Sequence, residues 1–354
     1  MPSPRALALA SLLLCAACDA AQLSPIDAGV GPERAEVPLP PPAELEGPSS
    51  EPQVFVLRDV VLRQGGGAWR ALGYDLDGRC SYPPDPLDGG APDGGGPYPG
   101  WDIECAPVNS GDLPSGDGAL CRDNNYGQFI SLGFEPLGID VQAEARELME
   151  AGEYALMLRL SDWNGEEDDP RVTVEVVQTA FGQPAGGLRG DPLRWDGTDT
   201  FFPSEAAFDD FGEPVLLDRT GYVVGGVVVM RIPPRSDFDF AGGARSLSVR
   251  ITDATLTGRL AGDRLQDVAL SGRWPVSDFL NELDDLGVCE GETLRGIVET
   301  AIRGSADVLA NPEATPGTLV PCDAVSVAIG FTGYPGRWGA DPQPPPTLPA
   351  PCPP

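Results

Sequence analysis

The distribution of proline along the chain limits which part of it can form a folded domain. Of 39 prolines in 354 residues, 22 lie in three short stretches, at residues 19–52, 83–100 and 339–354. Proline lacks a backbone donor and fixes φ, so such stretches do not join sheets or helix interiors. We therefore expect one folded domain at residues 53–338, after a Pro-rich tether at 18–52 and before a Pro-rich tail at 339–354.

Between these stretches, apolar residues recur in short β-branched runs bounded by turn residues, a pattern typical of antiparallel β structure. The runs at 54–62 and 68–76 flank three glycines and predict a hairpin. Further strands are predicted at residues 154–161, 171–178, 222–232, 246–251, 254–262 and 324–331. The expected fold is mainly β, a β-sandwich-like antiparallel domain, and the alternative is two subdomains divided near residue 200.

Two minor helices are predicted near the C-terminus. The segment SDFLNELDDLG, at residues 277–287, has Ser277 as an N-cap and Gly287 as a stop. The segment at 291–304 places apolar residues on one stripe of a helix, namely Leu294, Ile297, Val298, Ala301 and Ile302.

The first eighteen residues predict an export signal. Arg5 precedes a 13-residue apolar run, whereas a membrane-spanning helix needs about 20 apolar residues. The LLCAAC stretch resembles the lipobox of bacterial lipoproteins, in which the cysteine after two small residues is acylated and begins the mature chain. The resemblance implies a signal peptide at residues 1–17, lipidation of Cys18 and membrane attachment through a lipid anchor. The alternative is an ordinary secretory signal that is cut near Ala20.

The chain as a whole resembles the uncharacterised surface lipoproteins of high-GC Gram-negative bacteria, particularly the myxobacterial type. The resemblance rests on the lipobox-like signal, the Pro-rich tether, and the segments WRALGYDLDG, CRDNNYG and CDAVSVAIGF. It implies a place in the cell envelope, at the outer membrane or cell surface or on its periplasmic face. It implies no activity for this chain, because no activity is known for that group of lipoproteins.

The charged residues exclude several classes of function. The chain has no His, its 23 basic residues are all Arg, and 54 acidic residues leave a formal charge of −31. Without His there is no Ser-His-Asp or Cys-His catalysis, and the commonest zinc sites are excluded too. The acidic excess argues against binding nucleic acid and favours cations or neutral ligands.

The cysteines predict disulfides. If Cys18 is acylated and Cys15 is removed with the signal, an even number remains, which is typical of an oxidising compartment. We expect three structural bridges, with the pairs Cys289–Cys322, Cys105–Cys121 and Cys80–Cys352.

The densest group of oxygen ligands is the segment SDWNGEEDDP, at residues 161–170. Its polar residues alternate as the first ligands of a calcium loop do, and they predict a calcium site at Asp162, Asn164, Glu166 and Asp168. The twelfth position is Thr173, not the Glu of an EF-hand, and the flanks are strand-like. The alternative is a solvated hairpin loop that turns at Asn164 and Gly165.

A second candidate calcium site combines the segments YDLDG and CRDNNYG. They offer Asp75, Asp77, Asp123, Asn124 and Asn125, and a nearby disulfide could bring them together. Calcium would offset the repulsion between crowded carboxylates. The alternative is a pair of Asp-rich turns that bind nothing.

Two tryptophans lie in polar, loop-like settings, and they predict a sugar-binding surface at Trp163 and Trp195. The alternative is that both cover the edge of the core. We expect a calcium-stabilised, sugar- or protein-binding or structural protein of the cell envelope rather than an enzyme. The alternative function is a carbohydrate-active hydrolase with paired carboxylates. Candidate acids include Glu135, Glu175, Glu205 and Glu213, but the sequence offers too many acids to choose a pair.

Overall fold

The computed structural model describes residues 34–45, 47–62, 68–80, 104–106, 117–133, 140–234, 236–242, 245–285, 288–313, 320–344 and 352. The predicted signal peptide at 1–17, Cys18 and the Pro-rich stretch at 83–100 lie outside the described residues. Residues that precede the first strand contact the folded body. The amide of Ala35 donates to the carbonyl of Leu120, and the hydroxyl of Tyr222 donates to the carbonyl of Pro38.

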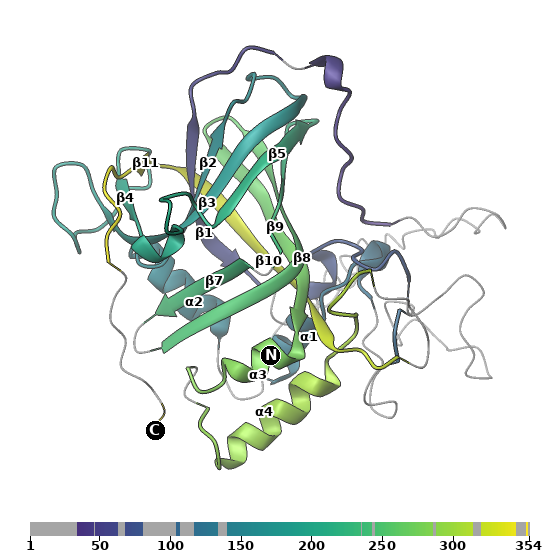
Figure 1. Cartoon of the computed structure of the whole chain (residues 1–354). Coiled ribbons are helices and arrows are strands. Elements are labelled where there is room, and N and C mark those ends of the chain that lie inside the picture. Colours follow the sequence, from purple (N-terminus) through teal and green to yellow (C-terminus); the bar gives the residue numbers. More distant parts are fainter. Residues whose placement is uncertain are drawn as a thin grey trace, which may run out of the picture. The chain divides into compact units, whose positions relative to one another are not determined.

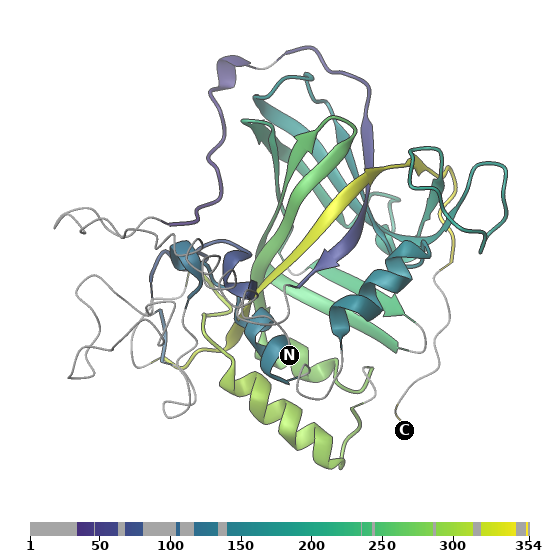
Figure 2. The same ribbon diagram turned by 180° about the vertical axis from the view of Figure 1, so that it is seen from behind.

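Eight antiparallel strands close into a barrel (Figure 1). Around the barrel each strand pairs with the next one along the chain, and β10 pairs back with β1 (Figure 2). The strands are β1 (Gln53–Val61), β2 (Leu156–Ser161), β3 (Asp169–Gln183), β5 (Leu216–Val224), β6 (Val227–Arg231), β8 (Arg245–Ala261), β9 (Arg264–Pro275) and β10 (Ala324–Pro335). The prediction of a mainly β fold is confirmed, but the sandwich is wrong. Closure gives every barrel strand a partner on both sides and leaves no free edge.

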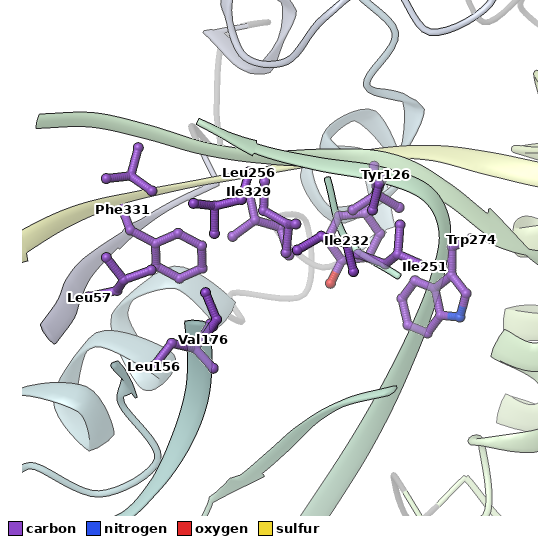
Figure 3. Packing of buried hydrophobic residues seen from close by; sticks show 14 of the residues in the cluster. Leu57, Tyr126, Leu156, Val176, Ile232, Ile251, Leu256, Trp274, Ile329 and Phe331 are labelled. Carbon is purple, nitrogen blue, oxygen red and sulfur yellow. The ribbon is translucent and has the colours of Figure 1, made fainter. Parts of the chain in front are cut away.

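The barrel interior is a continuous apolar core. Because side chains alternate between the two faces of a strand, every second residue of each barrel strand can join it. Members include Leu57, Leu156, Val176, Leu256, Ile329 and Phe331 (Figure 3). Each fully buried side chain of this kind stabilises the fold by about 1.5–3 kcal/mol relative to an exposed one.

Four helices lie in two of the connections between barrel strands. The β1–β2 connection holds α1 (Asn125–Gly133) and α2 (Val141–Glu150), and the β9–β10 connection holds α3 (Val276–Asn281) and α4 (Thr293–Gly304). Aromatic contacts join α1, β9 and α3, because the ring of Phe279 lies 4.4 Å from that of Trp274 and 6.0 Å from that of Phe129. None of the helices in the described part of the chain is both long and apolar enough to cross a membrane.

Smaller elements pack outside the barrel. Strand β4 (Thr200–Pro203) pairs with β3 and, in parallel, with β11 (Arg337–Trp338). They cover a second apolar cluster that contains Val56, Ala155, Met157, Val177 and Phe201. Strand β7 (Ser236–Gly242) pairs with β8. Short 3-10 turns are η1 (Ala43–Leu45), η2 (Ala68–Ala71), η3 (Ala119–Cys121) and η5 (Glu205–Ala207).

Several predicted elements differ from those in the structure. The hairpin of 54–62 with 68–76 is wrong, since 68–71 forms η2 and β1 pairs with β2 and β10. The predicted strand at 222–232 is two strands. Gly225 and Gly226 have φ of 55° and 74°, which suits a tight two-residue hairpin turn. The predicted strands at 246–251 and 254–262 are the single strand β8.

The predicted helices also have different bounds. The helix predicted at 291–304 is α4, and the one predicted at 277–287 is the shorter α3, which ends at Asn281. Acidic residues follow that end, and negative charge disfavours the C-terminal end of a helix. The helices α1 and α2 and the strands β4, β7, β9 and β11 were not predicted. In β9 the adjacent residues Gln266 and Asp267 are both polar and exposed, so they interrupt the alternation of apolar and polar residues that predicts a strand.

The six cysteines among the described residues form three disulfides, but all three predicted pairs are wrong. The bridges are Cys80–Cys121, Cys105–Cys322 and Cys289–Cys352, with Cα–Cα distances of 5.0, 5.1 and 5.4 Å. Two of the predicted pairs, Cys289–Cys322 and Cys105–Cys121, joined cysteines that are near in sequence, and the third paired the two that remained. Closure of the barrel instead brings together segments that are far apart in the sequence. Cys105, in the β1–β2 connection, pairs with Cys322, just before β10, although they are 217 positions apart.

Candidate metal centre

Three aspartates converge outside the barrel. Asp75 and Asp77 follow η2, Asp123 lies just before α1, and one oxygen from each carboxylate lies within 4.8 Å of the other two. Asp123 is buried, with 3% of its residue surface exposed, and Asp75 and Asp77 are half-buried as whole residues. The side chain of Asp75 is itself only 1% exposed. The structure therefore brings together three of the residues predicted for the second calcium site.

Local backbone structure explains why the two segments meet. The amide of Asp123 donates to the carbonyl of Tyr74, and the amide of Leu76 donates to Oδ2 of Asp123 at 2.6 Å. Gly73 has φ of 98°, and a Cβ on it would lie only 2.8 Å from that of Ala328 on β10. The segment thus packs directly on the barrel, and the Cys80–Cys121 bridge ties its end to η3.

Backbone amides orient the other two carboxylates. Oδ1 of Asp75 accepts from the amide of Gly78 at 2.7 Å, and Oδ1 of Asp77 accepts from the amide of Arg79 at 2.8 Å. These are turns in which an Asp side chain binds the backbone two or three residues later. Arg34 forms an ion pair with Asp75, with 3.3 Å between Nη1 and Oδ2.

Further buried acids surround the three aspartates. Asp117 and Glu104 are buried, and Asp307 accepts from the amide and hydroxyl of Ser326. Glu104 is paired with the buried guanidinium of Arg273, at 2.8 Å. The same guanidinium donates to the carbonyl of Leu76, so it ties β9 to the segment that carries Asp75 and Asp77.

Burial and crowding raise the pKa values of this group. Burial, and then the neighbouring Asp117, raises the pKa of Asp77 to about 8. Burial also raises the pKa of Asp123 well above its usual range, with Asp77 and Asp117 adding to the effect. Burial raises the pKa of Asp307 to about 7. In the absence of a cation, part of this group is therefore protonated at neutral pH.

The arrangement suits a hard divalent cation. Calcium binds carboxylate oxygens at about 2.4 Å, so two oxygens on opposite sides of one ion lie about 4.8 Å apart. The three aspartate oxygens meet that limit. A bound cation would also favour the ionised carboxylates, which otherwise repel one another. Asp75, Asp77 and Asp123 are the residues that would hold it.

The two asparagines of the second candidate serve other contacts. Asn124 caps α1, because its Oδ1 accepts from the amide of Gly127, and it also accepts from the amide of Ala328 on β10. The amide of the Asn125 side chain donates to the carbonyl of Ser305. Asn124 and Asn125 therefore dock α1 on the rest of the body through their side chains.

The acidic loop at 162–168 is the turn between β2 and β3, and its carboxylates form no such group among the described residues. Asp162 accepts from the hydroxyl of Thr173, and Asp168 accepts from the amide of Gly225. Glu166 is exposed. Asn164 accepts from the amide of Glu166 and donates to the carbonyls of Asp168 and Leu45. These polar atoms stabilise the turn.

The two tryptophans predicted to bind sugar pack against the protein. The indole nitrogen of Trp163 donates to the carbonyl of Glu166. The ring of Trp195 lies 5.2 Å from that of Phe201, and the guanidinium of Arg58 lies 4.9 Å from its centre. Both tryptophans are half-buried. Their surroundings are those of residues that cover the edge of a core.

The acids considered for hydrolysis are separately engaged. Glu175 forms an ion pair with Arg159, and Glu213 forms one with Arg219. Glu205 begins η5. Glu135 lies outside the described residues.

Sequence reasoning missed three acids beside the aspartates, Glu104, Asp117 and Asp307. Their signal is the neighbouring cysteines, because Glu104 adjoins Cys105 and Asp117 precedes Cys121 by four positions. The correct pair Cys80–Cys121 places Asp117 near Asp77, whereas the pair Cys105–Cys322 does not by itself bring Glu104 there. Asp307 carries no such signal.

Comparisons with known proteins assign no family to this chain. No protein-family model, no curated protein and no solved structure matches it. The function proposed below therefore rests on the residues and contacts just described.

Proposed function

We propose that the chain is an extracytoplasmic, lipid-anchored binding or structural protein of the cell envelope whose folded body is stabilised by calcium. The observation that carries the calcium proposal is the convergence of Asp75, Asp77 and Asp123. A metal that binds the folded state and not the unfolded chain stabilises the fold by an amount that grows with the logarithm of its concentration relative to Kd.

Charge and burial support calcium over magnesium at this place. Carboxylates that are buried together are costly unless a cation neutralises them. Calcium accepts six to eight oxygens in variable geometry, whereas magnesium requires a near-ideal octahedron and dehydrates reluctantly. A site assembled from two loops, with aspartates that differ in their surroundings, suits the more tolerant ion.

The envelope location is supported by the apolar start of the chain and by the three disulfides, which persist in oxidising compartments. Sugar binding by Trp163 and Trp195 is left out of the proposal, because both rings pack against the protein.

A melting experiment tests the calcium site. With calcium a hundredfold above Kd, the chelator-treated wild type should gain about 2.7 kcal/mol of stability, or about 5 °C in Tm for a body of this size. Asp77→Asn keeps the size of the side chain and should abolish the gain. Asp162→Asn, in the hairpin loop, is the matched control and should keep it. A wild-type melting curve unmoved by millimolar calcium would remove calcium from the proposal.

Detergent partitioning tests the anchor. The wild type should enter the detergent phase, and Cys18→Ser should stay in the aqueous phase or remain unprocessed, since an acyl chain adds about 0.8 kcal/mol of membrane affinity per buried methylene. Equal partitioning of the two proteins would show that Cys18 carries no lipid.

A further inference from the structure

A cleft of about 580 Å³ lies between α3 and α4, away from the three aspartates. Its walls are α3 and one face of α4, and residues Ala310, Cys322 and Asp323 complete the lining. The two helices lie side by side in both views of the molecule (Figures 1 and 2). The volume is within the range of sites that bind small ligands, about 300–1,000 Å³.

Three charged residues of α4 face the cleft at intervals of four, Arg295, Glu299 and Arg303. The first two are committed to each other, with 2.7 Å between Nε of Arg295 and Oε1 of Glu299. Arg295 also pairs with Asp284 and donates to the carbonyl of Leu280. It therefore holds α3 and α4 together as the walls of the cleft and has little charge left for a ligand.

Arg303 differs from Arg295. It lines the same cleft one turn further along α4, is exposed, and has no hydrogen bond or ion pair to another residue of the described chain. A cation in the last turn of a helix is favoured by the helix dipole, so exposure alone is not informative. Its place in the lining of a cleft that also includes apolar Val276 and Leu280 is the informative feature.

The acidic excess of the whole chain favours cations or neutral ligands, but Arg303 gives this cleft a local positive charge. We propose that this cleft binds the C-terminal carboxylate of a peptide that ends in an aliphatic residue. Arg303 would bind the carboxylate, and Val276, Leu280 and Ala310 would contact the aliphatic side chain. Arginine suits a carboxylate because its guanidinium can donate two parallel hydrogen bonds. No aromatic ring lines the cleft in the described residues, which favours an aliphatic group over a sugar ring. The inference rests on the proposed binding role, but it uses neither the calcium site nor the anchor.

The test uses N-acetyl-leucine as the probe and N-acetyl-leucinamide, which lacks the carboxylate, as the matched control ligand. Binding to the calcium-loaded protein is followed by NMR shifts of the Arg303 side chain and of backbone amides in α3 and α4. The acid should bind with Kd of about 1 mM, and the amide at least about tenfold more weakly. Arg303→Gln should weaken the acid about tenfold, and Arg337→Gln, at an exposed arginine on β11, should leave it unchanged.

Three results would overturn the inference. They are the absence of shifts in α3 and α4, equal affinity for acid and amide, and tighter binding of glucuronate, an acidic sugar, than of N-acetyl-leucine. Unchanged Tm and circular dichroism of Arg303→Gln ensure that a loss of binding is not a loss of folding. Calcium binding is measured separately by melting. A negative result for N-acetyl-leucine therefore leaves the calcium proposal standing, and a negative result for calcium leaves the cleft proposal testable.

Discussion

Two acidic regions of this protein differ in how their carboxylates are placed. The loop at 162–168 is dense in acids along the sequence, yet its side chains bind backbone atoms and one hydroxyl of their own hairpin and its neighbours. Asp75, Asp77 and Asp123 are sparse along the sequence, yet their carboxylates converge beside the barrel. Density in sequence and convergence in space are therefore separate properties.

The difference follows from what surrounds each region. Water and nearby amides can stabilise charges in a hairpin loop, so carboxylates there gain little from meeting one another. The segments that carry the three aspartates are held in place by packing against β10, by a disulfide and by the Arg273 guanidinium. These contacts keep the carboxylates close together even though the carboxylates repel one another. A region assembled in this way can bring like charges together, and a cation then relieves the repulsion.

Removing the bridge beside the aspartates should have the largest effect. Cys80→Ser with Cys121→Ser opens a loop of 41 residues and should lower the free energy of unfolding by about 4 kcal/mol. It should also weaken the calcium response, because the bridge ties together the segments that carry Asp77 and Asp123. Urea unfolding with and without calcium measures both effects. A double variant that keeps the full response would show that the bridge does not position the site.

Breaking the buried ion pair should have the next largest effect. Arg273→Met leaves Glu104 buried without its cation and should cost about 3 kcal/mol at neutral pH. The matched control is Arg219→Met, whose pair with Glu213 is more than half exposed, and it should cost less than about 1 kcal/mol. Adding Glu104→Gln to Arg273→Met should recover much of the loss. Similar costs for the two arginine variants would contradict the assignment of Arg273 as the tie between β9 and the aspartates.

The pH dependence of stability separates the calcium-free and calcium-bound proteins. The pKa of Asp77 is 3.8 in a free side chain and about 8 in the fold, so between these values the folded state holds a proton that the unfolded chain releases. Without calcium, stability should therefore fall as pH rises, by about 2 kcal/mol between pH 5 and 7.

With saturating calcium the trend should reverse, since calcium binds the ionised carboxylates and protons compete with it. Asp77→Asn should reduce the slope in both conditions, and Asp123 and Asp307, whose pKa values are also raised, should keep their contributions. Thermal unfolding over this pH range provides the measurement, and a calcium-free stability that rises with pH would contradict the raised pKa.

The strands could be predicted from sequence more readily than their arrangement. The runs at 154–161, 171–178 and 324–331 are apolar or alternating, and they correspond to β2, β3 and β10. Barrel closure depends on the pairings of β1 with β10 and β3 with β5, which no local pattern encodes. The turn at Gly225 and Gly226 was missed because valines flank both sides and continue the strand pattern.

The candidate site was also predictable only in part, because residue types can be read from the sequence but their positions in space cannot. Asp75, Asp77 and Asp123 lie in turn-like segments, and their types pointed to oxygen ligation. Asn124 was grouped with them, but its position before α1 makes it a helix cap. Asp307 lies in the β9–β10 connection. The path of that connection depends on tertiary structure, so the sequence alone could not place Asp307 near the aspartates.

Substitutions in the hairpin loop at 162–168 should have the smallest effects on stability, and they test the other half of the comparison with the three aspartates. Asn164→Ala removes the contacts of its side chain with Glu166, Asp168 and Leu45 and should cost about 1 kcal/mol, a typical net value for side-chain hydrogen bonds in a turn. Glu166→Ala, at an exposed side chain, should change stability by less than about 0.5 kcal/mol. Neither variant should alter the calcium-induced rise in Tm, because the hairpin carboxylates do not converge. If Asn164→Ala abolished that rise while Asp77→Asn preserved it, the metal would belong to the hairpin. The crowding of the three aspartates would then be relieved by protons alone.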